Sequence, residues 1–241
     1  YVQSRPYVQG DPVKSIDWRV SARTGVTHVK EYETPKCLPV WFIVDTSASM
    51  TLSSTTISKY QLAVQIAGGL ALSCIDKVSP VGILGAGSRD LNIKPSLSRD
   101  TILTWLHELR KYDFNESTHL AQKLISLSPS LAENTLIFVL SDFHDPDVLR
   151  ALKRLNHKHD VVSLVLRDPA EDDLRGAGLI RGKEVESKRV FTISAKKEFS
   201  RLEDTTAALK KSSVDHLALY TNKPILAPLR LFVQSRHLLS R

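Results

Sequence analysis

The sequence predicts an α/β protein built on a mostly parallel β-sheet with helices on both faces. Three segments carry this prediction, because residues 40–44, 135–140 and 160–166 are mainly apolar runs of strand length, rich in β-branched and aromatic residues. Such runs are typical of parallel strands that are covered on both faces. Segments of helical character separate them, and this alternation predicts a Rossmann-like order with right-handed crossovers.

The N-terminal segment, residues 1–36, is polar and irregular, with turn signals at Gly10-Asp11-Pro12 and Thr24-Gly25. Residues 26–32 alternate weakly and are a candidate edge strand. We expect this segment to pack on the main domain or to extend from it. Trp18 is expected to bury its ring among charged neighbours, with a partner surface as the alternative.

The main domain, residues 37–220, alternates strands with helices. Weaker apolar runs predict further strands at residues 81–86, 91–94, 190–193 and 216–220. Helical spacing and capping residues, such as Ser98, predict helices at residues 59–77, 98–112, 118–127, 146–157 and about 197–212. The first of these helices is apolar nearly all round, so we expect it to be largely buried.

The C-terminal segment, residues 221–241, is predicted to be a closing helix. Pro224 fits the first turn of a helix, and apolar residues recur at helical spacing from Leu226 to Val233. We expect this helix to pack back on the domain and to leave three arginines in solvent: Arg230, Arg236 and Arg241.

Composition narrows the class of protein. The net charge of +7 is a C-terminal property, because residues 175–241 hold 14 Lys/Arg against 6 Asp/Glu. This excess suits an acidic partner, anionic lipid or nucleic acid, but aromatic residues are not interleaved with it, which favours a solvated basic face.

Cys37 and Cys74 indicate two buried thiols in a reducing compartment. The longest apolar stretch, residues 60–75, is too short to cross a bilayer. We therefore expect a cytoplasmic domain, membrane-associated if an N-terminal anchor precedes it.

The ends of the three best strands carry carboxylates. Asp45, Asp142 and Asp168 each follow one of these strands, so they should meet at the carboxyl edge of the sheet. Like charges in one place are unfavourable unless a cation joins them. Ser47 and Ser49 can turn their hydroxyls to a point beside Asp45. Ligands that are all oxygen indicate Mg²⁺ or Mn²⁺, whose exchangeable position a partner's Asp or Glu could fill.

These motifs resemble a known kind of domain. Asp45-x-Ser47-x-Ser49, Thr118 and Ser141-Asp142 are similar, in order and approximate spacing, to the three metal-site motifs of von Willebrand factor A domains. The chain also resembles the bacterial family called domain of unknown function 58 over about residues 5–180. The motifs that carry this second resemblance are Arg5-Pro6-Tyr7-x-x-Gly10-Asp11, Ile16-Asp17-Trp18-Arg19-x-Ser21-Ala22-Arg23-Thr24-Gly25, Val29-Lys30-Glu31, His159-Asp160-Val161 and Asp168-Pro169.

The resemblance implies a von Willebrand factor A-like fold with a metal-ion-dependent adhesion site. Its ligands, direct or through water, would be Asp45, Ser47, Ser49, Thr118 and Asp142. Family members are often encoded beside MoxR-type AAA+ ATPases, which implies work with such an ATPase in the assembly, maturation or metal insertion of other proteins. The serine-rich loop at residues 51–58 departs from the family, in which a glycine is expected nearby.

We expect a protein-binding module rather than an enzyme. The alternative is a Mg²⁺-dependent hydrolase or phosphotransferase with Asp45 as nucleophile. That chemistry needs a second carboxylate where Ser47 stands, and a lysine aimed at the phosphate, but no lysine closely follows a core strand. A serine hydrolase is disfavoured because no G-x-S-x-G motif exists, and His144 is interpreted as a surface residue. Nucleic-acid binding by the basic C-terminal third is the third hypothesis.

Overall fold

The computed structural model describes residues 3–31, 38–111, 116–173, 179–183, 190–194 and 202–236. The chain divides into two units, Tyr1–Lys36 and Cys37–Ser240, which we describe separately.

The first unit is more regular than its sequence indicates. Strands β1 (Gln3–Pro6) and β2 (His28–Glu31) pair antiparallel, and between them lie the 3₁₀ turn η1 (Val13–Ser15) and helix α1 (Trp18–Thr24). The Asp17 carboxylate accepts a hydrogen bond from the backbone of Val20 at 3.1 Å and so caps α1. The expectation of an irregular segment was therefore wrong. Trp18 is 69% exposed, so its ring is not buried within this unit.

The second unit is built on a six-stranded sheet in the order β10-β7-β6-β3-β4-β5. All neighbours pair parallel except β5, which runs antiparallel to β4. In chain order the strands are β3 (Val40–Val44), β4 (Val81–Gly85), β5 (Asn92–Ser96), β6 (Leu136–Ser141), β7 (Asp160–Arg167) and β10 (Asp215–Tyr220). Every residue of β3 and β6 is buried, as expected for central strands, and the rings of Phe42 and Phe138 stack with centroids 5.2 Å apart.

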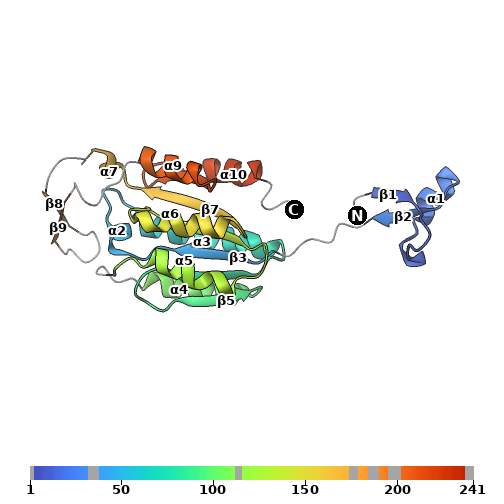
Figure 1. The fold of residues 1–241 in the computed structure, drawn as a ribbon, viewed down its shortest axis with the longest axis horizontal. Helices are drawn as coiled ribbons and strands as arrows, with labels where there is room; N and C mark the ends of the chain where they lie inside the picture. Colours follow the sequence, from blue (N-terminus) through green and yellow to red (C-terminus); the bar gives the residue numbers. More distant parts are fainter. Residues whose placement is uncertain are drawn as a thin grey trace. The chain divides into compact units, whose positions relative to one another are not determined.

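Helices cover both faces of this sheet, which confirms the predicted fold class (Figure 1). One apolar core joins the sheet to α3 (Lys59–Asp76), α4 (Arg99–Arg110) and α10 (Leu226–Ser235). The other core joins it to α5 (Leu120–Leu127), α6 (Pro146–Asn156) and α9 (Leu202–Lys211). Short turns of helix complete the unit: α2 (Ala48–Thr51), η2 (Ser128–Ser130) and α7 (Pro169–Asp173).

One predicted strand takes a different place, and one predicted helix has an exposed side. The strand expected near residue 190 exists as β9 (Val190–Ser194), but it pairs antiparallel with β8 (Leu179–Lys183) in a separate ribbon. Helix α3 starts with a capping box between Ser58 and Gln61, yet it is not buried all round, because Gly69 is exposed. The beginning of the helix expected at about residues 197–212 lies outside the described residues.

The C-terminal helix packs back on the domain through Leu229 and Val233, as predicted. It begins at Leu226, so Pro224 precedes the helix rather than occupying its first turn. Arg236 is not free in solvent, because its guanidinium is paired with Asp160 and Asp215, while Arg241 lies outside the described residues. Of the two cysteines, Cys37 lies outside the described residues, and burial raises the pKa of the Cys74 thiol to about 12.

Candidate metal centre

The loop after the central strand β3 places Asp45 at the carboxyl edge of the sheet. Its backbone N–H donates to the carbonyl of Leu140 in β6 at 2.9 Å, which continues the sheet pairing to the edge. The carboxylate is 2% exposed. It accepts hydrogen bonds from the Ser141 hydroxyl at 2.7 Å and from the Ser47 backbone at 3.0 Å. Asp45 is therefore held in one orientation by two neighbouring strand ends.

Ser47 and Ser49 connect Asp45 to Asp142. The short helix α2 starts directly after Ser47, and this turn brings the two serine hydroxyl oxygens to 3.1 Å from each other. Ser49 also hydrogen-bonds to the carboxylate of Asp142, the residue that follows β6. Four of the five predicted ligands thus form one continuous set of contacts. We call the part of this set that makes hydrogen bonds but no ion pair the hydroxyl half, which consists of Asp45, Ser47, Ser49 and Ser141.

The other part of the edge is a network of charges. The Lys59 ammonium lies 2.8 Å from Asp142 Oδ2 and also contacts Glu171, and all three side chains are almost fully buried. Glu171 in turn accepts from the Arg167 guanidinium at 3.2 Å. We call this network the ion-pair half, which consists of Lys59, Asp142, Arg167 and Glu171. Lys59 is the first residue of α3, so the capped start of that helix fixes where its side chain enters the edge.

The two aspartates have opposite proton affinities. Burial, together with repulsion from Asp142, raises the pKa of Asp45 to about 6, because hydrogen bonds offset only part of the desolvation. Burial also raises the pKa of Asp142, but the Lys59 ammonium, His144 and two hydrogen bonds outweigh it and lower this pKa to about 2. The negative charge of Asp142 is therefore balanced by Lys59, whereas no cation among the described residues balances that of Asp45.

His144 belongs to this edge and is not a surface residue, contrary to expectation. Its Nε2 lies 3.4 Å from Asp142 Oδ2, and its side chain is 16% exposed. Burial lowers the pKa of the imidazole more than the nearby carboxylate raises it. Asp142, His144 and Glu171 each offer one ligand atom within 4.8 Å of the others. The Lys59 ammonium already bonds to both of these carboxylates, so this triad is bridged by a cation of the protein itself.

The loop before α5 brings Thr118 toward the same edge. Its neighbours are pinned there, since the carbonyl of Glu116 accepts from the Ala48 backbone at 2.8 Å and the His119 backbone donates to Ala86 at 2.9 Å. The buried Glu116 carboxylate fills the space beside Gly87, where a Cβ would collide with it. Thr118 itself is exposed, and in the described ranges no hydrogen bond joins its hydroxyl to the hydroxyl half. Its role as a ligand stays a prediction.

Asp168 reaches the edge but serves another contact. Both of its carboxylate oxygens bond to Ser54, to the backbone N–H at 2.8 Å and to the hydroxyl. The serine-rich loop after α2 is thereby tied to the end of β7. Asp168 is therefore a structural tie, and Glu171, three residues further, is the residue that joins the charge network.

The donor set fits a hard divalent cation. The hydroxyl half offers carboxylate and hydroxyl oxygens, the ligand types that Mg²⁺ and Mn²⁺ prefer. The Asp45 carboxylate is buried and makes no ion pair with a cation among the described residues, and its burial raises its pKa. Sequence reasoning missed Lys59 and Arg167, whose burial has no local signal in the sequence.

Comparisons with known proteins agree with this architecture. Residues 3–214 match the family described as "Protein of unknown function DUF58". An uncharacterized protein of Mycobacterium tuberculosis is 26% identical over an alignment of 248 residues, which covers 97% of this chain and 78% of the relative. A protein of Mycobacterium bovis matches with the same figures.

Solved structures share the fold at low sequence identity. The conserved hypothetical protein BatB from Bacteroides thetaiotaomicron aligns with a TM-score of 0.60 and 13% identity, covering 84% of this chain and 98% of that one. An aerotolerance-related membrane protein from Bacteroides fragilis aligns with a TM-score of 0.54, at the same identity and coverage. With the strand order of the sheet, these matches support the von Willebrand factor A-like fold that the motifs predict.

Proposed function

The chain belongs to the DUF58 family, and from this premise we propose that its second unit is a metal-dependent protein-binding module. One observation carries the proposal: Asp45, Ser47, Ser49 and Asp142 lie in one chain of contacts at the carboxyl edge of the sheet. This is the edge at which open α/β sheets bind their ligands.

The residues that would hold the cation are Asp45, Ser47 and Ser49 of the hydroxyl half, together with Asp142 and Thr118. Ser47 and Ser49 would bind through their hydroxyls, and the two aspartates directly or through water. A bound Mg²⁺ would supply the positive charge that Asp45 lacks and would keep at least one exchangeable position. Lys59 keeps Asp142 ionised without a metal, so that the site needs no further deprotonation there before it binds a cation.

The proposed partner is a protein that presents an Asp or Glu carboxylate. Such a side chain can displace one water from Mg²⁺, which gives binding without chemistry. A MoxR-type AAA+ ATPase is our candidate, on the strength of the family resemblance. Within the described residues, no helix combines the length and the apolar character needed to cross a bilayer.

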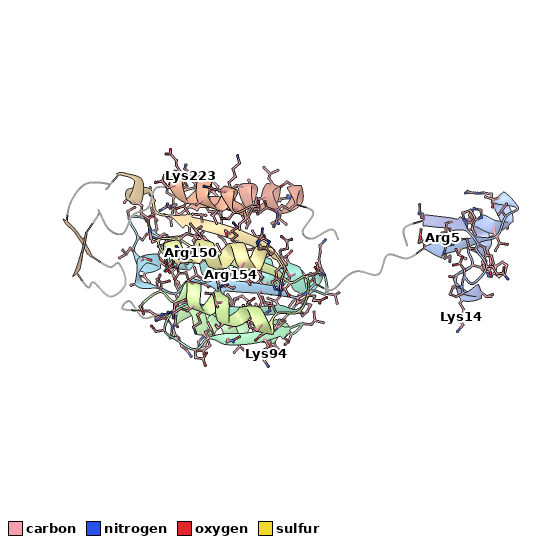
Figure 2. All side chains as sticks on the ribbon, in the orientation of Figure 1. Arg5, Lys14, Lys94, Arg150, Arg154 and Lys223 are labelled. Atoms are coloured by element: carbon pink, nitrogen blue, oxygen red, sulfur yellow. The ribbon has the colours of Figure 1, made fainter. Side chains whose placement is uncertain are left out.

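The structure gives less support to the two rival hypotheses, phosphotransfer and nucleic-acid binding. A phosphotransferase would use a lysine at this edge, and Lys59 is there, but its ammonium is committed to two buried carboxylates. For nucleic-acid binding by the basic C-terminal third, the described residues offer exposed cations such as Lys223 (Figure 2) and Arg230. A salt-dependent gel shift tests that alternative directly, since phosphate contacts weaken steeply with salt.

The first test measures thermal unfolding with Mg²⁺ and with chelator. The wild-type protein should gain stability with metal, by about 2.7 kcal/mol at a concentration of 100 times the Kd. The Asp45→Ala variant should fold and show no gain. Asp147→Ala removes an exposed carboxylate of α6 and serves as the matched control, which should respond like the wild type.

Equal gains in the wild type and in Asp45→Ala would exclude Asp45 as a ligand and remove the basis of the proposal. The second test is a pull-down of a MoxR-type ATPase from the same organism by the three proteins. Capture should require both Mg²⁺ and Asp45. Capture that survives chelator would show a partner contact that does not use the metal.

A further inference from the structure

Helix α3 has two sides that pack differently, and two adjacent glycines mark them. A Cβ on Gly68 would lie 3.0 Å from a methyl carbon of Leu106 in α4, so this side is closely packed. A Cβ on Gly69 would meet no atom within 4 Å. The open side faces α10, and there the two helices leave a groove of about 720 Å³. We call it the α3–α10 groove.

The groove is long and apolar. On α3 it is lined from Gln65 to Lys77, which is about 18 Å at about 1.5 Å per residue. Leu226, at the start of α10, is 78% exposed, although large apolar side chains are normally buried. The apolar residues that line the groove are Ile66, Leu70, Ile225, Leu226, Leu229 and Val233.

The charges of the groove have one sign. Among the described residues, the charged ones that line the groove are Lys77 and Arg230, and none that line it is a carboxylate. Arg230 is exposed and has no acidic partner within the part of the chain that the structure describes. An occupant should therefore be apolar on one face and negatively charged beside that face.

We propose that the α3–α10 groove binds an amphipathic helix of a partner protein, with acidic residues flanking its apolar face. An elongated apolar channel between two helices accepts the residues that recur along one side of a third helix. A second copy of this chain fits less well, because two such grooves would bring like charges together. The groove begins about two turns along α3 from Lys59, so this site is separate from the candidate metal centre and the proposal does not depend on it.

The experiment uses two fluorescein-labelled designed helices of about 18 residues, with leucines at i, i+3, i+4 and i+7 repeats. One carries glutamates at the remaining positions, and the other carries lysines. Fluorescence anisotropy measures their affinity for the whole protein and three variants. Gly69→Phe fills the groove, and Gly69→Ala changes the same residue while leaving the groove open. Arg230→Glu reverses its charge.

The glutamate helix should bind the wild type and Gly69→Ala equally, and both Gly69→Phe and Arg230→Glu roughly tenfold more weakly, a factor worth about 1.4 kcal/mol. Arg230→Glu should gain affinity for the lysine helix. Circular dichroism and thermal unfolding check that each variant is folded.

Four outcomes would overturn the proposal. The glutamate helix could fail to bind, or Gly69→Phe could bind it as well as Gly69→Ala does. Sodium dodecanoate could saturate the groove where the helix does not, which would make it a site for small amphiphiles. Sedimentation could show a wild-type dimer that Gly69→Phe dissociates, which would make the groove a self-association surface.

Discussion

The hydroxyl half and the ion-pair half lie at the same edge of one sheet, yet they balance negative charge by different means. In the ion-pair half, the Asp142 carboxylate is bonded to the Lys59 ammonium, so a side chain of the protein itself supplies the balancing positive charge. In the hydroxyl half, Asp45 receives only hydrogen bonds, from Ser141 and Ser47. Burial alone therefore does not distinguish the two aspartates. They differ in that the charge of Asp142 is balanced by Lys59, whereas Asp45 has only hydrogen-bond donors around it among the described residues.

The largest effect is expected in the ion-pair half. Lys59→Met keeps the length of the side chain but removes its charge, and it leaves Asp142 and Glu171 buried together without their shared cation. Breaking a buried pair by removing one partner costs about 3–5 kcal/mol of unfolding free energy. Urea denaturation at neutral pH in chelator measures this loss. Lys158→Met changes an exposed lysine and should stay within about 0.5 kcal/mol of the wild type. A loss below about 1 kcal/mol for Lys59→Met would mean that the network is not needed for stability, which would remove the contrast between the halves.

The second largest effect is a gain in unfolding free energy, expected when Asp45 of the hydroxyl half is replaced. The pKa of Asp45 is raised from 3.8 to about 6, so its protonated form favours the folded state. That contribution is complete below about pH 4 and is lost as the pH rises through 6. Asp45→Asn stays neutral, so in chelator it should be more stable than the wild type by about 2–3 kcal/mol at pH 8 and nearly equal to it at pH 4. Urea denaturation across this range measures the difference.

The difference between variant and wild type isolates Asp45, because His144 titrates in both proteins. Asp142→Asn provides the matched comparison. The pKa of Asp142 is lowered to about 2, so its ionised form stabilises the fold above pH 4 and this contribution is lost as the pH falls through 2. The variant should therefore be less stable than the wild type at neutral pH. If both asparagine variants shifted stability in the same direction, the two halves would not differ as described.

The smallest effect concerns Asp168, which belongs to neither half. Ser54→Ala removes the hydroxyl donor to Asp168 and leaves the backbone N–H donor at 2.8 Å. Loss of one partly buried hydrogen bond should cost about 1 kcal/mol, measured by thermal unfolding. Ser126→Ala, on the exposed surface of α5, is the control and should be neutral. The Mg²⁺-induced gain should be unchanged in both variants. A reduced gain in Ser54→Ala would place Asp168 in the metal site.

The sequence predicted the architecture well, because the signals for it are local. The apolar runs that became β3, β6 and β7 have the length and composition of covered parallel strands, and their end residues follow from the topology. Asp45, Ser47 and Ser49 lie within one turn of chain, so their meeting needs no distant information. Asp142 could be added because it follows a neighbouring strand.

What the sequence did not indicate depends on contacts between distant segments. Lys59 opens a helix, where a lysine is ordinarily solvated, and only the packing of α3 against the sheet turns it toward Asp142. Arg236 was expected in solvent for the same reason, and two carboxylates from β7 and β10 hold it instead. His144 was misjudged because a single histidine after a strand has no pattern that separates a buried from an exposed position.

The order of the strands also has a consequence for how this protein is made. The central strand β3 pairs with β4, which follows it closely in the chain, and with β6, which begins at Leu136. A ribosome that has synthesised β3, β4 and β5 has therefore produced a sheet whose β3 edge is apolar and unpaired. Such edges are templates for aggregation, and they are normally covered. The β3 edge therefore stays exposed while the ribosome synthesises the residues between β5 and β6. Throughout that time, Asp45 lacks its contacts with Ser141 and Asp142.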